Sequence, residues 1–498
     1  MAQLSPIRAN VPKLQGLDFL HRGKVRDSYS LGGPQWFLPL VTDGISIFDF
    51  VLNALVPEKG RILNAMSHFW LKHLESRDIK THMIVAGSAI DPYLPAHLRE
   101  DIDIQCRAMV AMKLQMVPIE FIARNCLTGS VLAEYRKSGT VYGTRLEEGL
   151  QDGDDLDHPL FTPTDKAEEG HDEPVDADDV RAKHEEETFL FLRAFAEVSR
   201  AARERKILLA DGKGEIGRDG NGIIRIGDEF GTPDSSRFWD LLTWQKSRKD
   251  PSRKAPSPFD KQLVRAWGIE QGINKLDPKN PDHVAQVHGM EVPAELLAAT
   301  TATYRYIFWR LTGRTFEEYA RREMDVMIPR RKRKLAIVFG SDSDIPAVAH
   351  ALKSIEDSDL RDGIEKTDVH VISCHRNPVE LDAFAASGCG GADVVIAAGG
   401  KALALPGVLD ALLHNKGKKI PVVGVALAKE GSTSEHAAVL SIEELPGEPV
   451  IIEESKGRAY VGVAGFNRAL RRVAHGEFAP SKLRTSKPAQ LNVDLSKY

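Results

Sequence analysis

The last third of this 498-residue chain repeats one pattern, a short apolar strand followed by a polar loop and a helix-like stretch. Residues 335–339 form the first such strand, 340–344 the loop and 345–355 the helix-like stretch. The strand pattern returns at residues 369–372, 393–397 and 421–425. Strands that are apolar on both faces must be covered on both faces. The pattern therefore predicts an α/β domain with a doubly wound parallel sheet.

The preceding two thirds mix strand and helix patterns without such a repeat, and we expect them to form a separate α+β domain. A chain of 498 residues is too long for a single core. We predict a first domain at residues 1–328, a basic linker at 329–334, a second domain at 335–479 and a polar tail at 480–498. The basic run could bind phosphate or nucleic acid, but such runs are more often solvated linkers.

Composition excludes several classes of function. The 66 basic and 71 acidic residues nearly balance, so no nucleic-acid partner is expected. The four cysteines are widely separated, which indicates neither a disulfide framework nor a zinc site. No long apolar run and no signal-like start occur, so we expect no membrane partner and a cytoplasmic location.

Residues 223–239 concentrate polar chemistry. A strand-like run ends in Asp228 and Glu229, a carboxylate pair that suits Mg²⁺ beside a nucleotide better than it suits a calcium cage. After a Pro-Asp turn, Ser235, Ser236 and Arg237 resemble an anion clamp that holds phosphate or carboxylate. The alternative is an exposed acidic strand end followed by an ordinary turn.

Further phosphate-type clusters occur upstream. Lys24 and Arg26 stand at alternate positions after Gly23, so on a strand both would face one side. A strand-like run delivers Arg124 and then a loop that contains Ser130. Separate clusters of this kind in one domain favour a binding site for phosphorylated ligands.

Residues 23–322 resemble the SAICAR synthetase family, that is, phosphoribosylaminoimidazole-succinocarboxamide synthases. The motifs that carry the resemblance are residues 23–27, 42–49, 118–130, 161–172, 228–239 and 257–262. The resemblance implies ATP-dependent joining of carboxyaminoimidazole ribonucleotide to L-aspartate, which gives SAICAR, ADP and phosphate. A small-molecule kinase would share the ATP cluster but would not account for Arg124 and Ser130 beside Arg237.

The resemblance also implies a role for each site residue. The ATP phosphates are assigned to Lys24 and Arg26, and Mg²⁺ to Glu215 and Asp228. The reacting phosphoryl and carboxylate groups are assigned to Lys166 and Lys213 as catalytic residues. The ribonucleotide is assigned to Arg124, Ser130, Ser235 and Arg237. Gly212 and Gly214 depart from the family pattern, and because glycine weakens a strand by roughly 0.5–1 kcal/mol, we expect a softer metal ligand at Glu215 and room for a bulge.

Residues 334–475 resemble the aminoimidazole ribonucleotide carboxylase family, through motifs at 340–344 and 373–378. The resemblance implies carboxyl transfer by a mutase or carboxylase, with His375 as the proton-transfer residue. It assigns the ribonucleotide here to Ser341, Asp342, Asp344 and Arg376, and implies a homo-oligomer, with an octamer built through this domain. The loop at residues 401–404 lacks the histidine of the family pattern. The alternative is therefore a ligase whose second domain is an inactive oligomerisation scaffold.

Overall fold

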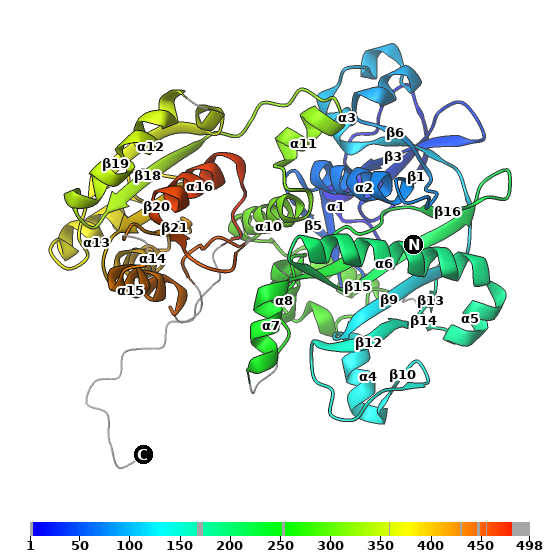
Figure 1. Cartoon of the computed structure of the whole chain (residues 1–498). Helices are drawn as coiled ribbons and strands as arrows, with labels where there is room; N and C mark the ends of the chain where they lie inside the picture. Colours follow the sequence, from blue (N-terminus) through cyan, green and yellow to red (C-terminus); the bar gives the residue numbers. More distant parts are fainter. Residues whose placement is uncertain are drawn as a thin grey trace. The chain divides into compact units, whose positions relative to one another are not determined.

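The computed structural model describes residues 3–166, 173–250, 254–357, 359–428, 431–445, 449–454 and 456–480 (Figure 1). Positions 167–172 of the predicted motif at 161–172, and positions 481–498 of the predicted tail, lie outside the described residues. The chain divides into two compact units. The first contains Met1–Arg331 and His475–Phe478, and the second contains Lys332–Ala474 and Ala479–Tyr498.

The first unit has two large sheets. One is antiparallel, with the strand order β1(Asp18–Arg22), β2(Arg26–Ser30), β3(Trp36–Val41), β7(Met109–Met112), β6(Met83–Ala86). The other has the path β14(Glu173–Pro174), β13(Thr164–Asp165), β9(Ile119–Leu127), β15(Ile207–Arg218), β16(Ile224–Gly227). On this second sheet β12(Asp154–Phe161) pairs with β9, and β8(Gln115–Met116) and β17(Ser236–Asp240) pair with β15.

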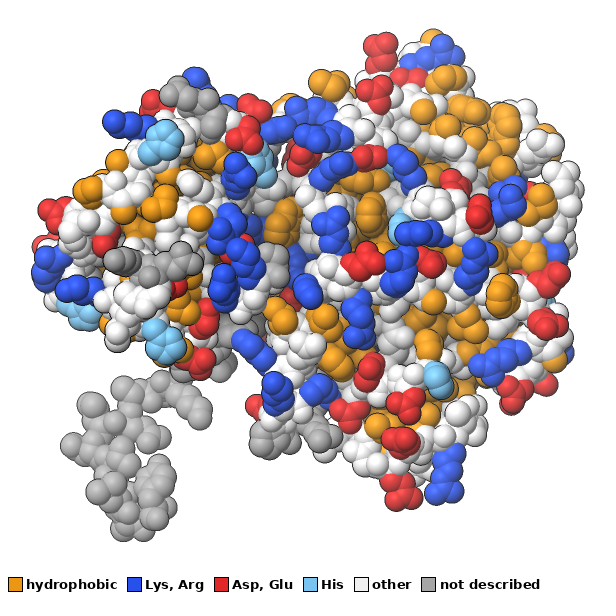
Figure 2. Space-filling model, viewed as in Figure 1, with side chains coloured by type: hydrophobic (Ala, Val, Ile, Leu, Met, Phe, Trp, Pro, Cys, Tyr) orange, Lys and Arg blue, Asp and Glu red, His pale blue; other side chains and the backbone are white. Residues whose placement is uncertain are grey.

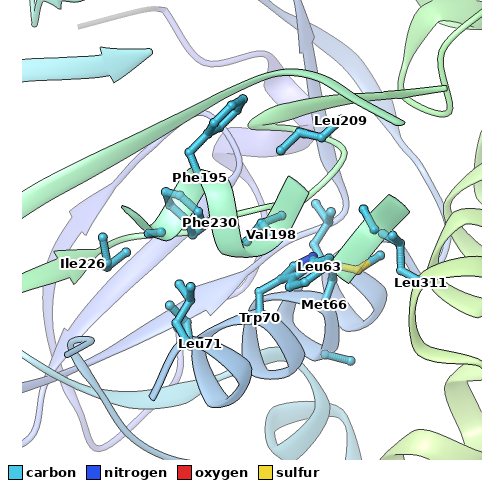
Figure 3. Close-up of a cluster of buried hydrophobic side chains, with 14 of the residues drawn as sticks. Leu63, Met66, Trp70, Leu71, Phe195, Val198, Leu209, Ile226, Phe230 and Leu311 are labelled. Atoms are coloured by element: carbon cyan, nitrogen blue, oxygen red, sulfur yellow. The ribbon is translucent and has the colours of Figure 1, made fainter. Parts of the chain in front are cut away.

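The main core of this unit lies around two long helices, α2(Lys59–Glu75) and α6(Glu185–Glu204). Both helices repeat apolar residues at helical spacing, so each has one face to bury. Figure 3 shows Met66 and Trp70 of α2 on one side of this core, with Phe195 and Val198 of α6 and Phe230 on the other. The core thereby fixes the second sheet, which carries Arg124, Lys213, Glu215 and Arg237 on its strands.

A smaller core forms around the hairpin of β4(Gly44–Ile47) and β5(Phe50–Leu55). Its apolar residues come from the hairpin and from neighbouring helices. The remaining helices of eight or more residues in the described part of this unit are α4(Ser130–Ser138), α7(Leu241–Lys249), α8(Gln262–Glu270), α9(Pro281–His288), α10(Ala294–Thr312) and α11(Phe316–Glu323).

The second unit is the predicted doubly wound α/β domain. Its five strands are all parallel, in the order β19(Ile364–Val371), β18(Arg333–Phe339), β20(Val394–Gly399), β21(Val422–Ala426), β22(Tyr460–Val461). Its helices are α12(Ile345–Asp357), α13(Pro378–Ala386), α14(Leu405–Asn415), α15(Thr433–Glu443) and α16(Gly462–His475). The central strands β20 and β21 are buried along their whole length, as their apolar sequences predict.

Strand boundaries differ from the prediction where polar residues take part in pairing. Strand β19 begins at Ile364, five residues before the apolar run, and its polar first half pairs with β18 at the edge of the sheet. Arg333, predicted as linker, is the buried first residue of β18 and donates to the Val473 carbonyl at 2.8 Å. Backbone hydrogen bonds, rather than side-chain polarity, set these boundaries.

The charge distribution on one face and the hydropathy of the described helices bear on the expectations from composition. On the face shown in Figure 2, acidic and basic side chains are interspersed over the first unit. None of the described helices combines the length and the apolar character that crossing a bilayer requires.

Candidate active site

A cavity of about 1280 Å³ in the first unit is lined by residues of both large sheets. The first sheet contributes residues of β1, β2, β3 and β7, and the second contributes residues of β9, β15 and the end of β16. Six of the predicted residues line this cavity, namely Lys24, Arg26, Lys166, Lys213, Glu215 and Asp228. The structure therefore brings together the residues assigned to ATP, to the metal and to catalysis in the first domain.

Strand geometry explains why three of these residues meet. Lys213 and Glu215 are two positions apart on β15, so their side chains leave the same face of the sheet. Glu215 lies opposite Gly227 in the register with β16, and Asp228 follows at once. The backbone of Asp228 is left-handed, with φ of 51°, a conformation that aspartate tolerates better than most residues.

Lys24 and Arg26 reach the cavity in a different way from the one predicted. They do not share one strand face, because the chain turns between β1 and β2 and Lys24 lies in that turn. The Gly23 amide closes the turn by donating to the Arg26 carbonyl at 2.7 Å. Arg26 is the first residue of β2, so the two cations line the cavity from a turn and from a strand.

The four predicted cations of the cavity each form an ion pair with a carboxylate of the cavity wall. These cations are Lys24, Arg26, Lys166 and Lys213. The N···O distances are 2.9 Å for Lys24–Asp49, 2.6 Å for Lys166–Glu215 and 3.0 Å for Lys213–Glu120. Arg26 contacts Asp228 and lies 3.6 Å from Glu229. The predicted phosphate-binding and metal-binding groups are thus partners of one another.

Two of these partners, Asp49 and Glu120, were not predicted as site residues, whereas Glu229 was predicted from its pairing with Asp228 in sequence. The positions of Asp49 and Glu120 within the motifs at 42–49 and 118–130 were the available signal. Sequence position alone does not tell which acid of a motif reaches a cavity and which stays at the surface.

The two unusual glycines of β15 have a packing role. A Cβ atom at Gly214 would lie 2.6 Å from Phe230 Cε2, and one at Gly212 would lie 3.0 Å from Ser236 Oγ. The irregularity in the pairing of β15 with β17 falls between Leu209 and Asp211, before the glycines. The glycines therefore let neighbouring side chains approach the strand, and the bulge lies upstream of them.

A second cluster surrounds Asp211 on β15. Arg124 Nη1 and Arg237 Nη1 lie 3.2 Å and 3.3 Å from the same carboxylate oxygen of Asp211. Asp211 is opposite both arginines in the register of the sheet, which explains the convergence. Asp211 offsets the repulsion between two like charges and holds both guanidinium groups in place. It was not among the predicted site residues.

The hydroxyl residues of the predicted clamp lie at the edge of this cluster. Ser130 is exposed at the start of α4, next to Gly129, whose missing Cβ would lie 3.1 Å from Arg237 Nη1. Ser235 is buried, and its hydroxyl accepts from the Thr232 amide at 3.2 Å. The structure therefore uses Ser235 to close the turn that precedes Arg237.

A buried ion pair holds the turn that contains Asp234 and precedes Arg237. Lys59 Nζ lies 2.7 Å from Asp234, and the Tyr304 hydroxyl donates to the same carboxylate at 2.5 Å. Burial would raise the pKa of Asp234, but the charges of Lys59 and Lys261 outweigh burial and hold this pKa well below its ordinary value. The turn is therefore anchored to the first residue of α2.

The carboxylates of the cavity fit Mg²⁺, which needs few protein ligands, better than a metal that is held by three or more side chains. No group of three or more His, Cys, Asp or Glu side chains is arranged to hold a metal within the described residues. Magnesium needs only one or two protein carboxylates and takes its other ligands from water and phosphate. Glu215 and Asp228 could supply those carboxylates, because both line the cavity close to Lys166 and Arg26.

In the second unit the predicted residues follow the carboxyl ends of neighbouring parallel strands. Ser341, Asp342 and Asp344 follow β18, whereas His375 and Arg376 follow β19. Arg376 Nη2 donates to the Gly340 carbonyl at 2.9 Å, which joins the two loops. His375 is exposed, with its Nδ1 3.6 Å from Cys374 Sγ.

The third loop of this edge follows β20. Asp344 accepts a hydrogen bond from the Gly400 backbone, while burial raises the pKa of its carboxyl group. A Cβ at Gly400 would lie 3.0 Å from Asp344 Oδ1, so the glycine allows a close approach of this carboxylate to the loop. The altered segment 401–404 contains Leu403, whose apolar side chain is buried against Gly399 at the end of β20.

Comparison with known proteins agrees with both halves of this description. The SAICAR synthetase family model matches residues 19–279, and the AIR carboxylase family model matches residues 334–464. The phosphoribosylaminoimidazole-succinocarboxamide synthase of Thermobifida fusca is 39% identical over 318 residues, which cover 62% of this chain and 95% of the relative. The enzyme of the same name from Corynebacterium urealyticum is 37% identical over 316 residues and is covered to 98%.

A solved structure agrees as well. The SAICAR synthase from Saccharomyces cerevisiae, in complex with SAICAR, is 30% identical, with a TM-score of 0.53, and covers 61% of this chain and 98% of its own. These relatives match the part of the chain that holds the cavity, and a separate family model matches the parallel-sheet unit. The chain belongs to the SAICAR synthetase family and carries an AIR carboxylase-like domain fused behind the synthetase.

Proposed function

We propose that the first unit joins carboxyaminoimidazole ribonucleotide to L-aspartate with ATP and gives SAICAR, ADP and phosphate. The observation that carries the proposal is the convergence of Lys24, Arg26, Lys166, Lys213, Glu215 and Asp228 on one cavity. A carboxylate is a poor electrophile, so ATP activates it as an acyl phosphate before the aspartate amine displaces phosphate. The protein must mainly bring several anions together and offset their charge.

The residues divide between the nucleotide and the ribonucleotide. Lys24 and Arg26 hold the ATP phosphates, and Lys166 and Lys213 stand at the reacting phosphoryl and carboxylate groups. Glu215 and Asp228 hold Mg²⁺, which when bound offsets phosphate charge and orients the terminal phosphate.

The ribonucleotide phosphate belongs to the second cluster. Arg124 and Arg237 are fixed by a shared carboxylate and can present two guanidinium forks, while Ser130 begins a helix beside them. A small-molecule kinase has no evident use for this second anion site.

The test is a coupled assay with purified protein, ATP, Mg²⁺, L-aspartate and the carboxylated ribonucleotide. ADP release should require both L-aspartate and the ribonucleotide, and SAICAR should appear in equal amount. ADP release that is independent of either substrate would contradict the proposal.

For the second unit we propose carboxyl transfer on the same ribonucleotide, with His375 moving the proton and Ser341, Asp342, Asp344 and Arg376 holding the substrate. Support comes from the three loops that meet at one sheet edge. The alternative is a ligase whose second unit is only an oligomerisation scaffold, and the altered segment 401–404 favours it.

An assay that starts from uncarboxylated ribonucleotide with bicarbonate, or from its N-carboxylated form, separates carboxylase, mutase and scaffold. His375→Asn should abolish carboxyl transfer and spare the ligase. If the unaltered protein transfers no carboxyl group from either substrate, the scaffold proposal holds.

We also propose a cytoplasmic homo-oligomer, with an octamer assembled through the second unit. Val369 and Val371 on the edge strand β19 are each 45% exposed, as expected of a face that another subunit covers. Light scattering after gel filtration should give a mass well above 55.0 kDa, the mass of one chain.

A further inference from the structure

Every carboxylate that lines the cavity of the first unit is paired with a cation of the same wall, as far as the structure describes the chain. The five carboxylates are Asp49, Glu120, Glu215, Asp228 and Glu229. Their partners are the cations assigned above to ATP and the reacting groups. A bare polyphosphate that enters this cavity therefore meets carboxylates that compete for the same cations.

A divalent cation changes this competition at two of the five carboxylates. Glu215 and Asp228 are the groups that fit Mg²⁺, and they are also the partners of Lys166 and Arg26. When both carboxylates turn to the metal, the ammonium of Lys166 and the guanidinium of Arg26 become available to phosphate oxygens. One exchange of partners thus supplies a metal site and two cationic side chains that can donate hydrogen bonds to phosphate.

The pairs are suited to such an exchange because they are accessible to water. In each pair one side chain is exposed and the other is partly buried: Lys166 is 44% and Glu215 19% exposed, while Asp228 is 37% and Arg26 19% exposed. Water screens the exposed member, so breaking such a pair costs less than breaking a fully buried one. By contrast, Lys59 and Asp234 are buried and stay paired as structural groups.

Two other cations of the wall, Lys113 and Lys279, have no acidic partner within the described part of the chain. They supply an attraction for phosphate that does not depend on the metal. Their presence means that metal-free nucleotide should bind weakly rather than not at all.

We infer that Glu215 and Asp228 are specificity-determining residues that select metal-bound nucleotide against free nucleotide, by holding Lys166 and Arg26 until a divalent cation releases them. This inference rests on the proposed use of the cavity for ATP. It predicts that one substitution weakens the binding of one form of the nucleotide and strengthens the binding of the other.

The test is equilibrium binding of ATP to the full chain by calorimetry, once with excess Mg²⁺ and once with a chelator. Glu215→Gln removes a metal ligand and frees Lys166. We expect it to bind Mg-ATP more weakly than the unaltered protein and metal-free ATP about threefold more tightly or better. Asp228→Asn, which suits the left-handed backbone at this position, should do the same through Arg26.

Asp49→Asn is the matched control, because it frees Lys24 without removing a proposed metal ligand. It should strengthen the binding of both forms of ATP. The inference is overturned if Glu215→Gln and Asp228→Asn, folded by circular dichroism, leave metal-free binding unchanged or weaken it. If the unaltered protein binds no Mg-ATP at all, the proposed function fails instead, so the two failures are distinguishable.

Discussion

Asp211 shows how a single acid organises an anion site. Its carboxylate lies within 3.3 Å of both Arg124 and Arg237, and all three residues lie on paired strands. A carboxylate between two arginines leaves one net positive charge and fixes two donors that would otherwise repel each other. Its role is to position the residues that would touch the ribonucleotide.

Asp211→Asn should therefore raise the KM for the ribonucleotide and leave the KM for ATP nearly unchanged. Loss of a charged hydrogen-bond partner costs about 2 kcal/mol, which corresponds to a change of roughly thirtyfold. Steady-state kinetics with each substrate varied in turn measures the two constants. A matched rise in both would show that Asp211 supports the whole domain rather than this cluster.

Residue burial also sets a pH dependence of stability. Burial, assisted by the charge of Lys72, lowers the pKa of His68 to about 4. The Nδ1 atom of His68 lies 2.9 Å from the Tyr319 hydroxyl. The unfolded histidine has a pKa near 6.5, so the unfolded state binds a proton first as the pH falls. The stabilising contribution of neutral His68 is thus present above about pH 6.5 and is lost as the pH falls toward 4.

His68→Gln should make the free energy of unfolding depend less on pH between about pH 4 and pH 6.5. Between pH 7 and pH 5 the variant should lose about 2 kcal/mol less free energy of unfolding than the unaltered protein. Urea unfolding followed by tryptophan fluorescence is the measurement, because all six tryptophans lie in the first unit. His158→Gln, at an exposed histidine, is the control and should leave the slope unchanged.

At the scale of elements, β15 is the strand on which the site depends. It pairs with β9, β16, β17 and β8, and it carries Asp211, Lys213 and Glu215. Its glycines allow the ring of Phe230 to pack directly on the strand. The spacing between Glu215, proposed to hold the metal, and Asp211, which holds the two arginines, is therefore set by one continuous strand.

Gly214→Ala should disturb this strand, because the new Cβ would lie 2.6 Å from the Phe230 ring, which belongs to the main core. Overpacking of this kind costs typically about 1–3 kcal/mol. Thermal unfolding should shift downward, and the KM for Mg-ATP should rise because Glu215 is the next residue. Gly212→Ala is the comparison, since its tightest new contact, at 3.0 Å, is the Ser236 hydroxyl, which can rotate away, and the Phe195 ring lies at an ordinary contact distance of 3.4 Å. Equal effects of the two substitutions would argue against the packing explanation.

At the scale of the whole molecule, Arg305 gathers residues that are far apart in the sequence. This buried arginine of α10 contacts Glu58 at 3.0 Å, Glu317 at 2.5 Å and Glu477 at 3.0 Å. Glu477 belongs to the short segment His475–Phe478, which is part of the first unit although it follows α16 in the chain. The first unit is thus completed by residues beyond the second.

Arg305→Met should lower the free energy of unfolding of the first unit by about 3 kcal/mol, because it leaves the buried carboxylates of Glu317 and Glu477 without this cation. Urea unfolding followed by tryptophan fluorescence tests this directly. Arg314→Met, which removes a partly exposed pair with Glu323, should cost well under 1 kcal/mol. A loss no larger than that of the control would mean that the three acids find other partners.

The sequence by itself determined the class of each unit and identified part of the cavity lining. Apolar runs fix strands that must be buried, so the parallel sheet was predictable from its strands. Six residues that stand in local motifs were predicted as site residues and line one cavity. Local sequence carries this information because strand, turn and residue type are local properties.

Only the tertiary structure decided which groups meet. The pairing of Asp211 with two arginines depends on the register of three strands, and the anchoring of Asp234 by Lys59 depends on where α2 packs. The ion pairs that line the cavity join residues far apart in the sequence, as in Arg26 with Asp228 and Glu229. Strand register and helix packing arise from burial over the whole domain, which no local pattern encodes.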